Sequence, residues 1–381
     1  MKKIILLGLF SFLFSSIQAQ QNDFKSSKTQ FMIRGYGSAS YMYVNSEDEH
    51  DSGSTFEMGS FAPIFLFKLS DRLMFEAELE FEYEHGEFEI MLEYADIMYN
   101  LNDYMTVRAG KFILPFGTFS ERLHPSWINK MVSMPLGFGH GAISPSSGVG
   151  AELRGAFNVG GSNFNYALYS TNGPTLSTDA HGAGMLNFGS TTDNNTNKAF
   201  GGRFGFLPFS DSSVELGFSF MNSVVGDAHS DFEDTKANLY AYDFSFIKKI
   251  NPLGGMLDIK AQYNQSIVDD ATYVNTHEDG DVETLVINDN KSSAYYAQLS
   301  YKPTMSSNAF IKNLEFVGRI SNIETPEASP ETSNQDSRTF GINYWLSWRS
   351  AIKFNYQVID GMGGHGPIDD KIFTIQWVIG L

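Results

Sequence analysis

The stretch Leu73–Glu84 reads LMFEAELEFEYE, and from Phe75 onward an apolar residue alternates with a glutamate. Successive side chains of an extended strand point to opposite faces, so this stretch has one apolar face and one carboxylate face. In an α-helix the same residues would be scattered around the axis. The stretch therefore predicts a strand whose two faces contact different surroundings.

The alternation recurs along the chain and predicts about 16 strands, most of them longer than an ordinary strand. Short connections alternate with long ones, which would place the short turns at one end and the long loops at the other. This pattern is typical of an all-β fold, a transmembrane antiparallel β-barrel of the outer membrane. A large soluble β-sandwich or a β-helix is the alternative, but sandwich strands are shorter. The expected strands are 30–44, 55–69, 73–84, 88–101, 105–114, 148–158, 164–172, 197–208, 213–224, 237–248, 256–268, 292–302, 312–323, 338–348, 351–359 and 371–381.

Both ends of the chain fit a bacterial outer-membrane location. Residues 1–19 combine a basic start, a short apolar run and small residues, which indicates a signal peptide cleaved after Ala19 or Gln20. We expect residues 20–29 to form an N-terminal periplasmic segment and residues 30–381 to form one barrel. The last expected strand, KIFTIQWVIGL, carries aromatic and aliphatic residues on one face, as the final strands of outer-membrane barrels do.

Composition and motifs argue against several other functions. The chain has 381 residues, a formal net charge of −18 and no cysteine. An acidic protein does not suit a nucleic-acid backbone, and a chain without cysteine has no thiolate nucleophile or thiolate metal site. It also lacks the G-x-S-x-G, H-E-x-x-H and P-loop motifs. We therefore predict no enzyme activity, no cofactor and no metal site.

A barrel of this size is wide enough for a water-filled lumen, and polar residues on the inner face would line it. Basic and acidic side chains both project inward in the expected strands, and a solvated lumen accommodates both. The expected lumen-lining residues are Arg34, Glu76, Glu78, Glu80, Glu82, Glu84, Arg108, Glu152, Arg154, Arg203, Lys260, Arg319 and Lys353.

The third loop, expected over residues 115–147, is much too long for a hairpin turn. It contains four prolines and several large apolar residues, which predict a loop folded into the lumen as a constriction. The alternative is a loop packed over the rim or against a neighbouring protomer. Its polar chemistry would come from Glu121, Arg122, His124, Lys130 and His140.

The run GKFILPFGTFSERLHPSWINK at 110–130, preceded by LEYADIMYNLNDYMTVRA at 92–109, resembles the Bacteroidetes members of the phosphate-selective porin O/P-like family. The resemblance implies a 16-stranded, trimeric diffusion channel with an inward-folded third loop. Anion selection requires a basic ring or ladder, whereas the expected lumen carries the stripe Glu76–Glu84. We therefore expect modest selectivity that favours cations at low salt.

Five of the expected long loops are strongly acidic: 46–54, 225–235, 269–290, 324–337 and 360–370 together hold 22 Asp and Glu and no Lys or Arg. An acidic rim would concentrate cations, and divalent ions could bridge it to lipopolysaccharide in the surrounding outer-membrane lipid. The leading hypothesis is a porin, a homotrimer if it follows the family, that passes small hydrophilic solutes or ions by passive diffusion. The alternative is a barrel that serves as a surface binding or adhesion platform, or as a partner in an envelope complex, through these loops.

Overall fold

The computed structural model describes residues 29–46, 52–57, 59–84, 87–139, 143–179, 182–189, 191–276, 282–364 and 366–381. The expected signal peptide at 1–19 lies outside the described residues. So does the expected periplasmic segment 20–29, apart from its last residue.

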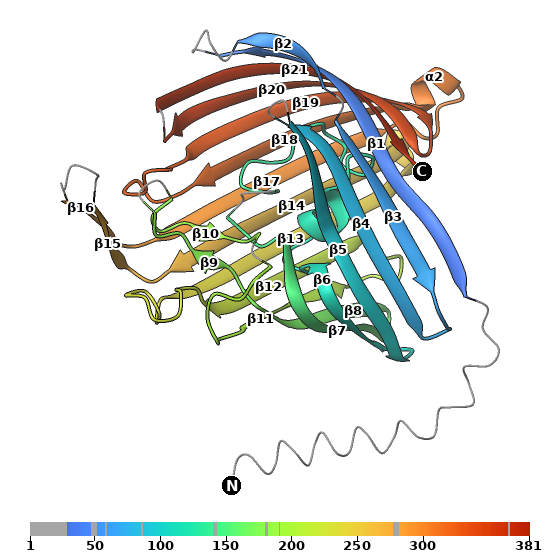
Figure 1. Ribbon diagram of the computed structural model, residues 1–381. Helices are drawn as coiled ribbons and strands as arrows, with labels where there is room; N and C mark the ends of the chain where they lie inside the picture. The colour runs from blue at the N-terminus through green and yellow to red at the C-terminus, as the bar shows by residue number, and fades with distance from the viewer. Residues whose placement is uncertain are drawn as a thin grey trace, which may run out of the picture.

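Seventeen of the described strands form one closed antiparallel sheet (Figure 1), and β9–β10 and β15–β16 form two small separate sheets. The ring closes where β1 pairs with the last strand, β21, from Tyr36↔Gly380 to Asn45↔Lys371. Strands β2 and β3 pair with successive parts of β1 and together form one barrel strand, which gives a barrel of sixteen strands. The barrel strands are β1 (Gln30–Asn45), β2 (Gly53–Glu57) with β3 (Ser60–Lys68), β4 (Leu73–Glu84), β5 (Glu87–Asn102), β6 (Met105–Ile113), β7 (Ser147–Val159), β8 (Ser162–Thr171), β11 (Ala199–Leu207), β12 (Val214–Val224), β13 (Lys236–Ile250), β14 (Gly255–Val268), β17 (Lys291–Lys302), β18 (Leu314–Glu324), β19 (Asn334–Ser347), β20 (Ser350–Gly363) and β21 (Gly366–Gly380).

Each of the sixteen expected segments coincides with a barrel strand, so the predicted fold class is confirmed. The segment Leu73–Glu84 matches β4 at both ends. In the sequence of the expected strand 88–101, the apolar positions change face near Ala95 and Asp96, which predicts a β-bulge there. The structure has the irregularity at Glu93, where the β4–β5 register shifts from the pair Glu78↔Tyr94 to the pair Leu79↔Leu92. The extra residue turns the following side chains to the opposite face, as a β-bulge does.

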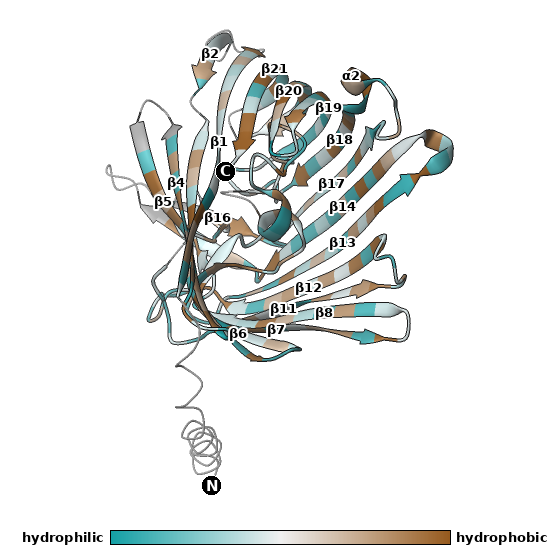
Figure 2. Cartoon of the chain, turned by 90° about the vertical axis from the view of Figure 1, so that its right-hand side faces the viewer, coloured by the Kyte–Doolittle hydropathy of each residue, from teal (hydrophilic) through white to brown (hydrophobic). Residues whose placement is uncertain are grey.

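The outer face of the barrel is apolar. Ile342 of β19 is 44% exposed and lies in register with Phe316 of β18 and Phe354 of β20, both exposed as well. Hydrophobic residues recur along the barrel strands in Figure 2. Such a surface suits lipid, in which every backbone group must be paired within the sheet. Among the described residues, no helix is long and apolar enough to cross a membrane.

The long-loop end of the barrel contains an apolar core that the sequence analysis did not predict. Tyr273 and Ile287 of a hairpin pack there with Leu239 and Met221 from the inner faces of β13 and β12. The fourth loop, residues 172–198, contributes Leu186 and Phe188. These inner-face positions were expected to border water, so the expectation of a wholly water-filled lumen is corrected at this end. The hairpin and the short strands of the fourth loop are β15 (Ala271–Thr276), β16 (Val282–Ile287), β9 (Thr175–Leu176) and β10 (Leu186–Asn187).

Helical structure is confined to connections in the part of the chain that the structure describes. A π-helical turn lies in the third loop, and two short helices lie in turns at the opposite end of the barrel. They are η3 (Phe119–Leu123), η4 (Asn251–Leu253) and α2 (Ala309–Lys312).

An arginine on the lipid-facing surface should destabilise the barrel. Ile342→Arg places a charge in the middle of the apolar surface and should lower the free energy of unfolding in lipid vesicles by about 2–4 kcal/mol. The matched control is Thr272→Arg, at an exposed position of hairpin strand β15, which should change it little. Equal effects of the two substitutions would mean that the surface around Ile342 does not face lipid.

Candidate functional site

The third loop runs from Leu114 to Ser146 in the structure and lies inside the barrel, as predicted. Its first residues cross to strands far from β6. The backbone N–H of Gly117 donates to Ser219 Oγ of β12 at 2.9 Å. The N–H groups of Thr118 and Phe119 both donate to Gln262 Oε1 of β14, at 2.8 and 3.0 Å. Polar side chains of the opposite wall therefore hold the loop backbone.

A glycine is required where the loop meets β14. Gly117 has a φ of +65°, a conformation that residues with a side chain rarely adopt. A Cβ at this position would lie 1.9 Å from Gln262 Nε2. The same glycine thus permits both the left-handed turn and the hydrogen bonds that Gln262 accepts.

Lys353 of β20 holds the part of the third loop from Ser126 to Met131. Its side chain is 1% exposed, and Nζ donates to the carbonyl oxygens of Ser126 at 2.5 Å and Asn129 at 2.7 Å. The carbonyl oxygen of Met131 lies at 3.4 Å. No carboxylate of the described residues forms an ion pair with Lys353, so backbone dipoles stabilise this buried charge.

Neighbouring strands add further anchors along the returning part of the loop. Each is a hydrogen bond between a wall side chain that faces inward and the loop, and together they attach the loop to β18, β19 and β20. The bonds are Arg319 Nη2 to Ser133 O (2.9 Å), Asn343 Nδ2 to Lys130 O (2.9 Å), Val132 N to Asn355 Oδ1 (2.6 Å) and Leu136 N to Ser321 Oγ (3.2 Å).

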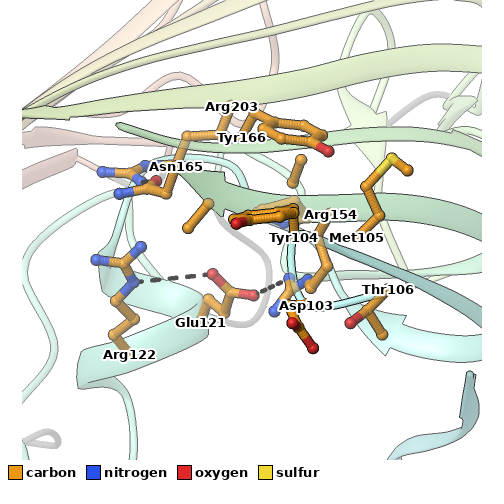
Figure 3. Close-up of a pocket in the computed structure, with 14 residues that line it drawn as sticks. Asp103, Tyr104, Met105, Thr106, Glu121, Arg122, Arg154, Asn165, Tyr166 and Arg203 are labelled. Carbon is orange, nitrogen blue, oxygen red and sulfur yellow. Dashed lines mark hydrogen bonds and ion pairs between the residues drawn. The ribbon is translucent and has the colours of Figure 1, made fainter. Parts of the chain in front are cut away.

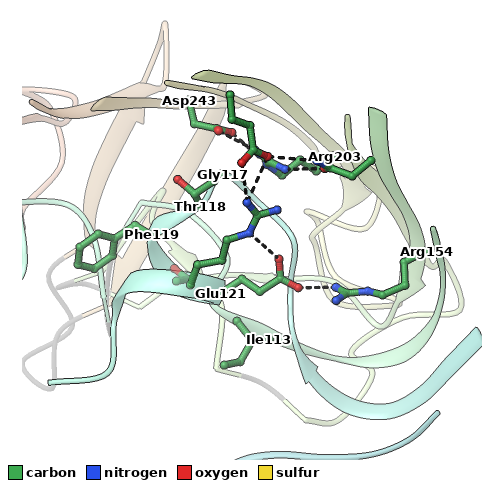
Figure 4. A network of polar contacts seen from close by, with 12 residues as sticks. Ile113, Gly117, Thr118, Phe119, Glu121, Arg154, Arg203 and Asp243 are labelled. Atoms are coloured by element: carbon green, nitrogen blue, oxygen red, sulfur yellow. Dashed lines mark hydrogen bonds and ion pairs between the residues drawn. The ribbon is translucent and has the colours of Figure 1, made fainter. Parts of the chain in front are cut away.

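A chain of ion pairs of alternating sign joins the loop to β5–β7 and β11–β13, and Figure 4 shows its part from Arg154 to Asp243. Arg122 of the loop pairs with Glu215 at 2.9 Å, and Glu121 pairs with Arg154. On the wall, further pairs continue the chain in both directions. In order, its members are Asp96, Arg108, Glu152, Arg154, Glu121, Arg122, Glu215, Arg203 and Asp243.

Lys130 forms a second charged cluster with the wall. Its Nζ lies 2.7 Å from Glu315 Oε1 and 2.7 Å from Asp258 Oδ2. Glu315 also accepts a hydrogen bond from Trp345 Nε1 at 2.9 Å, and Asp258 pairs with Lys260 at 2.5 Å. Both loop bases predicted for the constriction, Arg122 and Lys130, are thus bound to wall carboxylates.

The loop charges are stable near neutral pH. Burial alone raises the pKa of Glu121, but Arg154, Arg122 and Arg108 outweigh it and leave the pKa below its ordinary value. Burial lowers the pKa of Lys130, but Glu315 and Asp258 outweigh it and leave the pKa raised. Both groups therefore stay ionised, and the loop remains tied to the wall by charge.

The carboxylate stripe of β4 differs from this paired network. Glu78 and Glu80 are buried on the inner face, whereas Glu76 and Glu82 are half-buried. Glu78 accepts a hydrogen bond from Tyr36 of β1 at 2.8 Å. Among the described residues, no ion pair joins Glu76, Glu78 or Glu80 to a basic side chain. The inner wall at β4 thus carries carboxylates that no direct ion pair neutralises within the described residues.

The remaining predicted site residues fall in several places. Arg34 is exposed near the start of β1. His124 follows the π-helical turn, and its Nδ1 lies within hydrogen-bond distance of Ser120 O, so it belongs to the local loop structure. His140 and the side chain of Glu84 lie outside the described residues.

Sequence reasoning did not select Tyr36, Asn343 and Asn355 as site residues, although each contacts the stripe or the loop. The alternation of faces along the strand could have identified Tyr36, because Tyr36 lies two residues after Arg34 and therefore on the same face of β1. The role of the two asparagines depends on where the loop passes, which alternation does not reveal.

A cavity of about 300 Å³ lies between the third loop and the short-turn end (Figure 3). Arg122 and Arg154 line it from either side of Glu121, and Tyr104 of the β5–β6 turn lines it as well. The side chains of Arg122 and Arg154 are 39% and 33% exposed, respectively. The cavity is therefore a polar space lined by three arginines, Arg122, Arg154 and Arg203, and two carboxylates, Asp103 and Glu121.

Solved structures with a similar fold include porins and a channel of the outer membrane. An anion-selective porin from Comamonas acidovorans aligns with a TM-score of 0.58 at 13% identity, covering 93% of this chain and 100% of that one. The channel DcaP of Acinetobacter baumannii gives a TM-score of 0.60 at 11% identity, with 93% and 99% covered. OmpF of Salmonella typhi, in complex with daunomycin, gives 0.57 at 12% identity, with 92% and 97% covered.

The fold is that of the outer-membrane porins. No protein-family model and no curated protein matches the chain. At identities this low the porin fold carries no information on the solute, so the site must be interpreted from its own residues.

Removing the lysine that holds the loop should loosen it without opening the barrel. Lys353→Met deletes the ammonium group but keeps an apolar stem of similar length. Hydrogen bonds to a charged group contribute about 1.5–3 kcal/mol each, so amide exchange over residues 126–133 should accelerate more than tenfold. The control, Lys371→Met, removes an exposed lysine and should leave exchange in the loop unchanged. Unchanged exchange in Lys353→Met would show that the other wall bonds suffice to hold the loop.

Proposed function

We propose that the protein is an outer-membrane porin that allows small hydrophilic solutes or ions to diffuse through a lumen narrowed by the third loop. The observation that carries the proposal is the loop itself, which lies inside a closed barrel and is bound to the inner faces of strands from β12 to β20. A loop held in this way reduces the free cross-section without depending on a bound partner.

In this proposal the constriction is bounded by two chemically different surfaces. The third loop supplies Glu121, Arg122, His124 and Lys130, whose charges are largely compensated by the wall. The β4 stripe supplies Glu76, Glu78 and Glu80, which form no ion pair with a basic side chain of the described residues. The resemblance of residues 92–130 to the phosphate-selective porin O/P-like family supports the diffusion channel and a homotrimer. It does not supply the basic ring that phosphate selection needs.

Surface binding is the competing function, and one observation favours it. The β15–β16 hairpin projects from the long-loop end beyond the barrel (Figure 1), and Val274 and Val286 on it are exposed. A barrel that serves only as a surface binding platform would not need an open channel. Conductance of the purified protein in planar bilayers separates the two functions.

The mature protein should form stable, water-filled channels, and removing the loop should widen them. Deletion of residues 118–140 removes most of the third loop and should raise the single-channel conductance. Heat-modifiable migration in electrophoresis checks that the barrel still folds. An unchanged conductance in a folded deletion variant would place the narrowest point elsewhere, and no conductance in the mature protein would favour the platform.

The charge preference should follow the β4 stripe. Glu76→Gln, Glu78→Gln and Glu80→Gln in combination should bring the K⁺/Cl⁻ permeability ratio towards one, whereas Arg122→Ala should raise it because Glu215 loses a partner. The control, Asp71→Asn, removes an exposed carboxylate at a short turn and should have little effect. Reversal potentials in a KCl gradient at low salt measure the ratio. A strong anion preference in the unmodified protein would refute the assignment.

A further inference from the structure

A second cavity lies at the long-loop end, apart from the charged network. It has a volume of about 220 Å³ and is enclosed by the ends of β14, β17 and β18, by the fourth loop, by residues 325–333 and by Ile143 of the third loop. A solute that entered from the long-loop side would reach this cavity before it reached the ion-pair chain. Its lining therefore bears on which solutes are admitted.

One side of the cavity presents hydroxyl groups. Ser266 of β14 and Ser292 of β17 lie directly opposite each other in the strand register. Ser266 is 4% exposed and shares the inner face with Asn264, which donates to Ser144 of the third loop at 2.8 Å. Among the described residues, neither serine hydroxyl has a hydrogen-bond partner. Two adjacent hydroxyls that border a cavity are therefore free to bind a ligand.

Another part of the cavity lining is apolar and is packed against the core. Phe188 and Leu186 of the fourth loop line it, and both pack against the apolar core at this end of the barrel. Asn290 donates from Nδ2 to Gly184 O at 2.9 Å and fixes the fourth loop to the start of β17. The aromatic ring and the two hydroxyls are thus positioned by a packed core and a buried hydrogen bond, without any contribution from a ligand.

The charge of the lining narrows the ligand class. Glu331, which is exposed, is the only ionisable side chain among the lining residues, and none of them is basic. An anion would gain no partner and would meet a carboxylate, whereas an alkyl chain would leave the serines unsatisfied. The volume is below the ~300–1,000 Å³ typical of sites for drug-sized ligands, which suits a single small ring.

We propose that this cavity captures one uncharged, hydroxylated ring solute of monosaccharide size. Its hydroxyls would bond Ser266 and Ser292, and its apolar face would lie on Phe188. The inference extends the proposed porin function, because it names the class of solute that the long-loop end retains before passage. It assigns recognition to the serine pair and the fourth loop, whereas the third loop sets the width.

Binding can be tested with methyl β-D-glucopyranoside, whose ring has apolar faces and hydroxyls around its edge. Saturation-transfer NMR on the full mature protein in detergent should show saturable binding in the millimolar range. The double variant Ser266→Ala with Ser292→Ala should weaken it about tenfold, and so should Phe188→Ala. The matched control is Ser245→Ala, on the inner wall at β13 away from the cavity, which should bind normally.

Conduction provides an independent measurement. In planar bilayers, the glycoside added at the long-loop side should produce reversible current interruptions in the unmodified protein and fewer in the serine variant. Sodium acetate at equal concentration should not compete in the NMR assay. Absence of saturable binding, binding by the serine or Phe188 variant that is as tight as binding by the unmodified protein, or competition by acetate would overturn the capture site. Binding without any channel conductance would retain the capture site and refute the porin function, so the two failures are distinguishable.

Discussion

A β-sheet within lipid cannot have an open edge, because no water is present there to form hydrogen bonds with the unpaired backbone N–H and C=O groups. The pairing of β1 with β21 removes that edge and closes the ring, and every other feature of the molecule depends on it. Closure separates an outer face that must be apolar from an inner face that can be polar. The alternation of Leu73–Glu84 follows directly from this separation. Once closed, the wall provides fixed positions against which an internal loop can be held.

The inner wall uses its charges mainly to hold the third loop. Arg122 and Lys130 are each neutralised by wall carboxylates, and Glu121 is held by Arg154. Pairing of this kind offsets the cost of burying ions, which is large for any ion left alone. A consequence is that the loop bases contribute little net field to the lumen. The field that remains comes from the carboxylates on β4 and from the acidic loops.

The strands were predictable because each has one face towards lipid and one towards the interior of the barrel. Apolar and polar residues therefore alternate along the strands throughout the chain. The position of the bulge was missed by about two residues, since an inserted residue reverses the phase without marking which residue is extra. The inward third loop was predictable from its apolar residues. The pairing of Arg122 with Glu215 was not, because the partners are 93 residues apart and meet only through the barrel register. The apolar core of the fourth loop was missed because Leu186 and Phe188 lie among small and polar residues.

The backbone carbonyl oxygens around Lys353 determine how part of the third loop responds to salt concentration. Mobile ions weaken the attraction between exposed charges, and at 1 M salt that attraction extends only about 3 Å. A buried ammonium held by peptide dipoles is out of reach of such ions. The loop segment from Ser126 to Met131 should therefore keep its position in brackish or concentrated media, while the field of the acidic loops fades. In this barrel, the loop segment held by Lys353 is therefore insensitive to salt, whereas the field of the acidic loops weakens as salt rises.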